Sequence, residues 1–164
     1  MLTDAVTPED LRHAMGHFAT GVTVITARDA AGAPVGTTAN AVTSLSLDPP
    51  LILACFARES LTLAHVREHG AFAVNVLASH HADASTAFAK RGAAEAWQLV
   101  EHRDGRTNSP RVHDAIAVLD CVVEQRLPGG DHEILIGRVV DVEAAGGAPL
   151  VYWRGAYANL ERAA

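Results

Sequence analysis

The chain has 164 residues, of which 49% are hydrophobic and 20% are charged, and its formal net charge is −6. This length and apolar content predict a single domain over residues 1–164 with its own core, and they exclude intrinsic disorder, collagen and coiled coil. The negative charge argues against a general nucleic-acid or membrane-surface binder, because no basic field would attract a polyanion.

The first predicted element is a helix that begins at Pro8. Thr7 can cap its N-terminus, and apolar residues recur at helical spacing as far as Phe18. Gly21 can end this helix, because glycine readily takes the left-handed conformation of a helix end.

Strand-like runs follow, rich in aliphatic and β-branched residues and bounded by turn-forming residues. In chain order, the expected strands cover residues 22–27, 35–46, 51–56, 72–77, 115–127, 132–143 and 150–152. Short helices are expected at 60–69 and 79–90, and residues 92–110 are expected to form a loop with one helical turn. The run 51–56 is entirely apolar, which predicts a fully buried strand.

The arrangement of these elements indicates the fold class. The turn Pro128-Gly129-Gly130-Asp131 predicts a hairpin between two long strands. The strands do not alternate regularly with long helices, which disfavours a doubly wound parallel sheet. We therefore expect a mainly β fold, a small closed or split antiparallel barrel with a few helices outside it.

The N-terminal residues and the cysteines predict a cytoplasmic protein. No positively charged apolar leader is present, and no run of about 20 apolar residues would cross a bilayer. Cys55 and Cys121 lie in strand-like runs without C-x-x-C spacing, so buried reduced thiols are expected.

Two motifs suggest other chemistry and fit it poorly. The segment from His65 to His69 matches the H-x-x-E-H pattern of zinc peptidases, but Gly70 ends its short helix at once. Residues 16–21 have the glycine spacing of a phosphate loop, yet they lack its lysine and precede a strand. A zinc hydrolase that uses His65 and His69 is therefore the least favoured alternative.

Three polar runs are candidates for ligand binding. Residues 36–44 combine small side chains, hydroxyls and an amide, which would let a flat ligand approach the backbone. Residues 58–62 open a helix and carry hydroxyls and one guanidinium, a combination that can hold a phosphate. Residues 88–91 hold the only lysine, Lys90, beside Arg91. Exposed Thr-rich strands, serine caps and solvated helix ends are also common, so these runs alone define no site.

Several short blocks occur in an order that is specific as a set. They are residues 21–26, 36–40, 44–51, 72–77, 88–89, 130–132, 136–139 and 152–160. In this order the chain resembles the flavin reductase-like family, the small reductase components of two-component flavin-dependent monooxygenases. The likeness spans nearly the whole chain.

This resemblance implies a split β-barrel of Greek-key type that binds FMN or FAD, usually as a homodimer with the flavin near the subunit interface. Around the isoalloxazine and ribityl groups it places Thr37, Thr38, Ala39 and Asn40, with Ser44 close by and Ala54 and Cys55 lining the ring. At the phosphate it places Arg58, Ser60, Leu61 and Thr62, and over the far end of the cofactor Phe88, Ala89, Lys90 and Arg91. His132 resembles the family histidine on the nicotinamide side of the flavin, and Tyr157 is expected to face the site.

The sequence departs from the family pattern at two places. Ala41 follows Asn40 where the family commonly has serine, which removes one hydroxyl. Residues 94–99 stand where many members carry an Asp-Arg-Phe run. The sequence therefore does not identify which cofactor tail or substrate this segment would contact.

The activity implied by the resemblance is that of an NAD(P)H:flavin oxidoreductase. Hydride would pass from nicotinamide C4 to flavin N5, and the reduced flavin would leave for a separate partner monooxygenase. This chemistry needs alignment more than acid–base catalysis, which agrees with the absence of an obvious catalytic triad. His132 is then the expected catalytic residue, orienting the nicotinamide amide.

Alternatives remain open at this point. The same barrel would also suit a non-catalytic flavin-binding module, or a structural domain without a ligand. FAD is slightly favoured over FMN by likeness to aromatic-hydroxylating systems. NADH is weakly favoured over NADPH as the hydride donor, because no second basic cluster in the sequence marks a site for a 2′-phosphate.

Overall fold

The computed structural model describes residues 5–160. Every strand pair in this part of the chain is antiparallel, and strands predominate over helices, as the sequence predicts. In chain order the elements are α1 (Pro8–Met15), β1 (Thr20–Gly21), β2 (Thr23–Arg28), β3 (Pro34–Ala39), β4 (Val42–Leu47), β5 (Pro50–Ala57), α2 (Leu61–His69), β6 (Ala71–Val76), the 3₁₀ helix η1 (Ser79–His81), α3 (Ala82–Phe88), the 3₁₀ helix η2 (Ala94–Gln98), β7 (His102–Asp104), β8 (Pro110–Val112), β9 (Ala117–Gly129), β10 (His132–Ala144), β11 (Val151–Trp153) and β12 (Ala156–Ala158).

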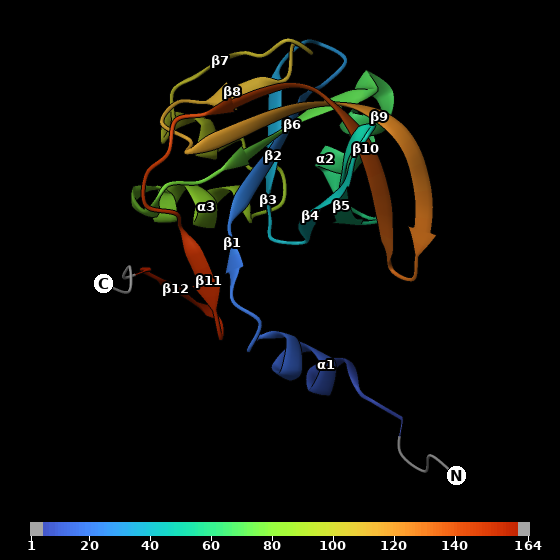
Figure 1. Cartoon of the computed structure of the whole chain (residues 1–164), viewed down its shortest axis with the longest axis vertical. Coiled ribbons are helices and arrows are strands. Elements are labelled where there is room, and N and C mark those ends of the chain that lie inside the picture. The colour runs from blue at the N-terminus through green and yellow to red at the C-terminus, as the bar shows by residue number, and fades with distance from the viewer. Residues whose placement is uncertain (1–4, 161–164) are drawn as a thin grey trace.

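A seven-stranded sheet forms the body of the molecule, in the order β3-β2-β6-β9-β10-β5-β4. Its two edge strands, β3 and β4, are consecutive in the chain and are joined only by Asn40 and Ala41. In a flat sheet these edges would lie roughly 29 Å apart, six spacings of about 4.8 Å. The three steps from Ala39 to Val42 span at most about 11 Å. The sheet therefore curls until its edges approach each other, as Figure 1 shows.

The main core lies against the curled sheet and one helix. Ile25, Phe72 and Leu135 from three strands pack with Leu63 and Val66 of α2, and all five are at most 1% exposed. Each such side chain contributes roughly 1.5–3 kcal/mol of transfer free energy. The predicted ends of α2 are confirmed, because Ser60 caps its start and Gly70, with φ of 74°, ends it.

A second core cluster lies on the other face of β2. Val24 packs there with Phe88 of α3 and with Leu150. Successive strand residues point to opposite faces, so Val24 and Ile25 enter different clusters and β2 is buried on both sides. The second cluster fixes α3 against the back of the sheet beside β3.

Two strand predictions need correction. The run 35–46 is two strands, β3 and β4, which lie at opposite edges of the sheet and are separated at Asn40 and Ala41. The run 51–56 is not buried on both faces, because burial alternates along β5 and Leu51, Leu53 and Cys55 are only half-buried.

The first helix is shorter than predicted. It ends at Met15, and the carbonyl of Gly16 instead accepts a hydrogen bond from the backbone N–H of Arg154, at 2.9 Å, which ties the chain to the β11–β12 turn. No residue of α1 is buried, and Figure 1 shows it projecting from the sheet. The apolar residues of the predicted helix, among them Met15 and Phe18, are therefore exposed, at 56% and 67%.

The short elements were the hardest to predict. Ser79 does not cap a helix over 79–90: it opens η1, its N–H bonds to the carbonyl of Ala148, and α3 begins at Ala82. Twelve strands are described where six or seven were expected, because strands of two or three residues such as β7 and β12 leave little pattern in the sequence. None of the helices within residues 5–160 is long and apolar enough to span a membrane.

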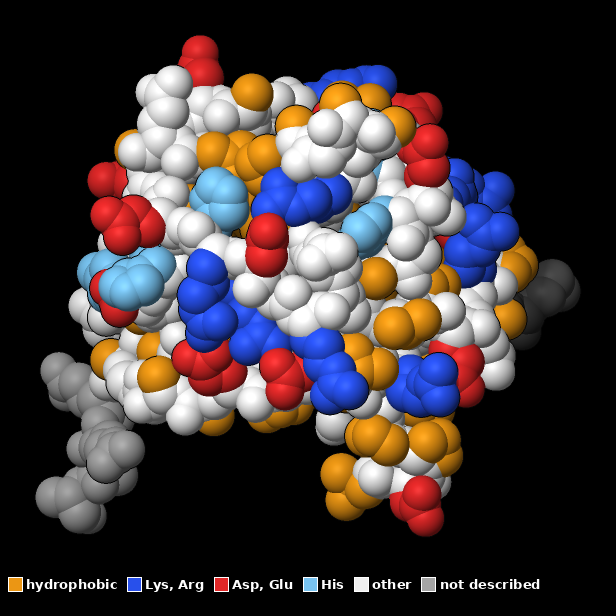
Figure 2. Space-filling view, turned by 90° about the horizontal axis from the view of Figure 1, so that it is seen from above, with side chains coloured by type: hydrophobic (Ala, Val, Ile, Leu, Met, Phe, Trp, Pro, Cys, Tyr) orange, Lys and Arg blue, Asp and Glu red, His pale blue; other side chains and the backbone are white. Residues whose placement is uncertain are grey.

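A cluster of paired charges joins β8, β9 and β10. The Arg111 guanidinium, 7% exposed, lies 2.9 Å from Oδ2 of the fully buried Asp120 and also contacts Asp141 and Glu143. Asp120 also accepts a hydrogen bond from the backbone N–H of Arg106. Figure 2 shows acidic and basic side chains interspersed on the face above β7 and β8. These groups satisfy one another and hold the loop before β8 onto the sheet.

Candidate functional site

A groove of about 240 Å³ opens where the β3 end of the sheet meets β5, the start of α2 and the start of β10. Its wall consists mainly of small or polar residues: Thr37, Thr38, Ala39, Asn40, Ala41, Cys55, Phe56, Ala57, Ser60 and His132. Of the predicted site residues, the structure brings together Thr37, Thr38, Ala39, Asn40, Cys55, Ser60 and His132. Ala41, Phe56 and Ala57 join them as immediate neighbours of predicted residues in the chain.

The β3 wall of the groove presents main-chain groups. Within residues 5–160, β3 is an edge strand that pairs with β2 on one side only, so alternate N–H and C=O groups on its other side have no strand partner there. Behind it, the Thr38 hydroxyl donates to the carbonyl of Ser85 at 2.6 Å and ties β3 to α3. A Cβ on Gly36 would lie 3.1 Å from the Phe88 ring, so this close approach favours glycine. The β3 wall is thus fixed to α3 on one side, and its free main-chain groups are accessible from the groove on the other.

The N-terminus of α2 closes one end of the groove. Ser60 Oγ accepts a hydrogen bond from the N–H of Leu63, at 3.3 Å, which caps the helix. The first N–H groups of an α-helix have no partner within the helix, and its dipole is positive at this end. An anionic group placed beside Ser60 would therefore be stabilised by the helix.

His132 stands at the other end of the groove, where the β9–β10 hairpin turns. Its Nδ1 lies 2.8 Å from Oδ1 of Asp131, and this hydrogen bond is the main cause that lowers the pKa of Asp131. With the Nδ1 proton donated to Asp131, a neutral imidazole presents Nε2 as an acceptor. His132 can therefore accept a hydrogen bond from an amide N–H of a ligand in the groove.

The strand β5 supplies Cys55 to the groove and turns Ala54 away. Cys55 is half-buried, whereas Ala54 is fully buried among core residues, as the alternation of a strand requires. The prediction that the Ala54 side chain lines the ligand is therefore not met. Burial raises the pKa of the Cys55 thiol, and burial with the nearby Asp120 raises that of Cys121 to about 12. Both cysteines are free and remain protonated at neutral pH.

Two other predicted residues are buried away from the groove. Phe88 is fully buried behind β3, where its ring packs edge-on against Trp97 with centroids 4.9 Å apart. Thr62 is 5% exposed on the inner face of α2. The Phe88 side chain therefore does not close over the far end of a ligand in the groove. The Thr62 side chain, predicted at the phosphate, does not line the groove, although its backbone belongs to the first turn of α2.

The remaining predicted residues do not line the groove. Tyr157 donates a hydrogen bond from its hydroxyl to Ser85 Oγ at 2.9 Å, so it fixes α3 to β12 and does not face the groove. Arg58 turns toward a different hollow. The others are exposed: Ser44, Leu61, Ala89, Lys90 and Arg91.

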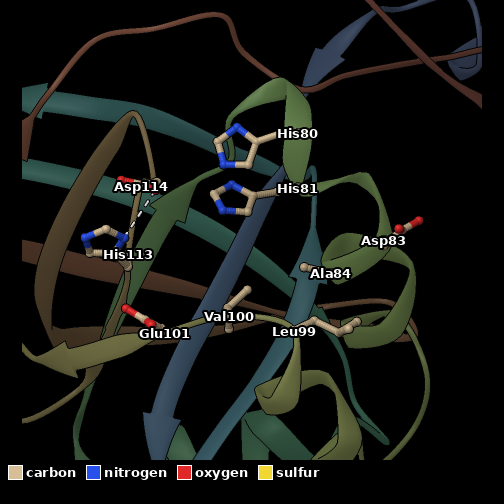
Figure 3. A pocket seen from close by; sticks show the side chains of 9 residues that line it. All are labelled: His80, His81, Asp83, Ala84, Leu99, Val100, Glu101, His113 and Asp114. Atoms are coloured by element: carbon tan, nitrogen blue, oxygen red, sulfur yellow. Dashed lines mark ion pairs between the residues drawn. The ribbon is translucent and has the colours of Figure 1, made fainter.

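A separate hollow of about 510 Å³ lies beside η1 and shares no residue with the groove. Figure 3 shows His80 and His81 side by side, with His113 and Asp114 across from them. His81 Nδ1 accepts a hydrogen bond from the backbone N–H of Ala78, at 3.2 Å. Burial, and then the proximity of His80, lower the pKa of His81, which keeps its imidazole neutral near pH 7.

No group of three metal-ligating side chains occurs within residues 5–160. In the zinc-like pattern, His69 Nε2 lies 3.1 Å from the carbonyl oxygen of Thr107. The Nδ1 atom of His65 is buried and has no hydrogen-bond partner within residues 5–160. The described residues thus supply no third ligand to complete a zinc site on His65 and His69.

The fold is shared with a class of flavin-reducing enzymes. The chain superimposes on the NADH:FAD oxidoreductase of Streptomyces globisporus C-1027 with a TM-score of 0.88 and 30% identity, covering 99% of each chain. Residues 15–161 match the flavin reductase like domain. The chain belongs to the flavin reductase-like domain family, as its sequence motifs predict.

Curated relatives carry the same domain. The chain is 45% identical to a probable flavin reductase of Rhizobium meliloti (strain 1021), over 96% of this chain and 50% of that protein. It is 38% identical to the reductase component of the 4-nitrophenol 4-monooxygenase/4-nitrocatechol 2-monooxygenase of Rhodococcus opacus, over 92% of this chain and 80% of that protein. The chain thus spans half the length of the first relative and most of the second.

Proposed function

We propose that the chain is an NAD(P)H-dependent flavin reductase whose groove holds FAD or FMN. The observation that carries the proposal is the convergence on one groove of an edge-strand backbone, a helix N-terminus and His132, in a member of the flavin reductase-like family. Small side chains leave space for a flat ring, and free main-chain groups match the polar edge of an isoalloxazine.

The donor set of the groove fits a flavin in two parts. Residues 37–40 and Cys55 meet the ring system and the ribityl chain. The start of α2, with Ser60 and the N–H groups of Leu61 and Thr62, receives the phosphate. The exposed segment 89–91, which carries Lys90 and Arg91, is assigned to the far end of the cofactor.

His132 aligns the hydride donor. A bound flavin supplies the redox chemistry, accepting hydride at N5 from C4 of a reduced nicotinamide. Nε2 of His132 accepts a hydrogen bond from the carboxamide of the nicotinamide, while Asp131 holds the Nδ1 proton and fixes the ring. Protonated Cys55 adds no charge beside the ring. The chain therefore contributes orientation, which is sufficient for hydride transfer.

The reduced flavin is then delivered to a separate flavin-dependent monooxygenase. Support for this step is the likeness to the Rhodococcus opacus protein, which is by its name the reductase component of a monooxygenase. A groove bordered by an edge strand on one side suits a flavin that binds and leaves.

The curled sheet is a split barrel of Greek-key type in this proposal, and it functions as a homodimer. Large apolar side chains are exposed on α1, β4 and β11, including Met15, Leu47 and Trp153. Soluble monomers rarely expose extended apolar patches. A hollow of about 580 Å³ beside α1 shares Asn40 with the groove, so a second subunit covering α1 would border the flavin.

Three finer choices complete the proposal. FAD is preferred to FMN, and NADH is the donor assigned first, both supported by the name of the similar Streptomyces globisporus enzyme. A cytoplasmic location rests on the two free cysteines, Cys55 and Cys121.

Steady-state oxidation of NADH and NADPH, followed at 340 nm with FAD and with FMN in turn, tests the proposal. We expect oxidation only when flavin is present, and reduction of a stoichiometric flavin under nitrogen. Flavin binding without oxidation of either nucleotide would leave a non-catalytic flavin-binding module and reject the enzyme. Failure of both flavins to bind would reject both functions.

A further inference from the structure

A hollow of about 340 Å³ next to His132 is lined by three arginines. We call it the arginine hollow, and its lining is Arg58, Arg67, Arg126, Leu127, Pro128 and Glu133. Arg58 follows β5, Arg67 lies on α2 and Arg126 lies on β9. Their distance from one another in the sequence explains why no motif marks this basic cluster.

The arginine hollow has an excess of positive charge. Glu133 is its one carboxylate, and it pairs with Arg67 through two contacts, Nε to Oε1 at 3.1 Å and Nη2 to Oε2 at 2.5 Å. The three arginines, Arg67 most strongly, lower the pKa of Glu133. Arg58 and Arg126 have no carboxylate within ion-pairing distance in the described part of the chain. Two guanidinium charges are thus available to an anion.

The direction of Arg58 separates this hollow from the phosphate site at α2. Arg58 Nε donates a hydrogen bond to the carbonyl oxygen of His132 at 3.3 Å, so its side chain runs along the start of β10. It lines the arginine hollow and not the groove at Ser60. The sequence-based assignment of Arg58 to the flavin phosphate is therefore not supported by its position.

The arginine hollow and the groove meet at one strand end. His132 lines the groove, and Glu133, the next residue of β10, lines the hollow. The β10–β5 ladder ends at the pair His132 and Ala57, and Arg58 follows Ala57, so the two spaces lie on opposite sides of this strand end. A ligand whose head lies at His132 would reach the hollow by passing around this strand end.

We propose that the arginine hollow binds phosphate of the nicotinamide dinucleotide donor. The inference rests on the proposed function, in which His132 holds the nicotinamide. One ribose connects the nicotinamide to the pyrophosphate, which places phosphate oxygens within a few bonds of the nicotinamide ring. The 2′-phosphate of NADPH lies further along the same ligand, on the adenosine ribose beyond the pyrophosphate, and is an anion that guanidinium groups bind in the same way. The weak preference for NADH rested on the lack of a second basic cluster, and the arginine hollow supplies one.

Flavin-free binding tests the hollow independently of turnover. ADP-ribose carries the pyrophosphate without nicotinamide, and 2′-phospho-ADP-ribose adds the second phosphate. Titration calorimetry of each probe would compare the parent with Arg126→Gln and Arg126→Glu. We expect Arg126→Gln to weaken binding about fivefold to tenfold and Arg126→Glu to weaken it more, since one charge-assisted hydrogen bond is lost or reversed.

The matched control is Arg138→Gln, an exposed arginine of the same strand pair that faces Glu124 at 3.5 Å. It should bind both probes as the parent does. Equal weakening of both probes by Arg126→Gln assigns the pyrophosphate. Weakening of the 2′-phosphorylated probe alone assigns the 2′-phosphate. Unchanged binding in both Arg126 variants, or no binding of either probe to the parent, overturns the inference.

Kinetics separate the failure of this inference from the failure of the proposed function. In a working reductase, Arg126→Gln should raise KM for the dinucleotide about fivefold to tenfold and leave KM for flavin and kcat unchanged. An active parent whose KM is unaffected by the variant rejects the hollow and keeps the function. A parent that binds the probes through Arg126 but oxidises no nucleotide rejects the function and keeps an anion site. Unfolding curves verify that each variant is folded.

Discussion

The ligand groove and the Arg111 cluster are both polar, yet their polar groups have different tasks. Around Arg111, guanidinium, carboxylates and backbone N–H groups satisfy one another, and Asp120 is fully buried. The groove is different, because its polar groups border an open space. They are the free edge of β3, the start of α2 and Nε2 of His132. Pairing within the Arg111 cluster fixes a loop to the sheet, whereas the unpaired donors and acceptors of the groove can bind a ligand. Mutations should therefore separate stability from binding.

The largest expected effect is the removal of Arg111. Arg111→Leu strands the buried Asp120 without its cation, and breaking one side of a buried ion pair costs about 3–5 kcal/mol. Urea unfolding followed by circular dichroism measures the loss. Arg103→Gln removes an exposed arginine from Glu143 in the same cluster and should change stability by less than about 1 kcal/mol. Equal losses of unfolding free energy in the two variants would show that the buried Arg111–Asp120 pair contributes no more to stability than an exposed ion pair.

The next largest effect concerns activity alone. His132→Ala should lower kcat about 100-fold through loss of alignment, with flavin affinity and unfolding free energy nearly unchanged. NADH oxidation at saturating flavin, together with flavin titration, measures the two quantities. Asp131→Asn retains the imidazole but weakens its support, since the Nδ1 contact of 2.8 Å loses its charge, and should give a smaller decrease. Wild-type rates in His132→Ala would remove His132 from the site.

Replacement of the α2 cap should affect both properties modestly. Ser60→Ala removes the hydroxyl that accepts from Leu63, which costs about 1 kcal/mol, and it should weaken flavin phosphate binding as well. Thr7→Ala removes the cap of α1, whose side chains are not in the groove, and is the matched control. Fluorescence titration with FMN compares them. Identical FMN affinity in both variants would argue that the start of α2 does not hold the phosphate.

The smallest effect is a pH dependence that comes from the hollow beside η1. The pKa of His81 in the folded protein is lower than its ordinary value of 6.5, so the unfolded chain takes up the proton first as the pH falls. This contribution to stability is therefore present above pH 6.5 and is lost progressively as the pH falls from 6.5 through the lower pKa of the folded protein. Protonation of Nδ1 would also break the bond from Ala78.

Urea midpoints between pH 7.5 and 5.5 measure this slope. His81→Asn should reduce the slope, while His13→Asn on the exposed α1 should leave it unchanged. An undiminished slope in His81→Asn would assign the acid sensitivity to other groups.

Local signals made much of the fold predictable. The long hairpin formed where Pro and Gly interrupt two β-rich runs, and α2 lies between its predicted cap Ser60 and its terminating Gly70. The break at Asn40 and Ala41 was missed because both halves of the run 35–46 have strand-forming residues, and their separation to opposite edges is a property of the whole sheet.

The site was predictable to the extent that it follows the chain. Residues 37–40 lie together because they are one strand end, and the family likeness added His132. The direction of a side chain was not predictable: burial turned Phe88 and Ala54 inward, and a bond to a carbonyl turned Arg58 aside. The arginine hollow depends on three elements that meet only in the folded chain.

The two-residue link of Asn40 and Ala41 joins the two edge strands covalently, so the curled sheet and this link form a closed ring of chain beside the groove. The length of the link limits how far apart the two sheet edges can stand, and its two residues line the groove themselves. Inserting residues there would let the edges move apart beside the groove, and cutting the backbone there would release both edges at once. The same insertion at Gly146 and Gly147, in the connection from β10 to β11, would leave the link between the two sheet edges at its present length.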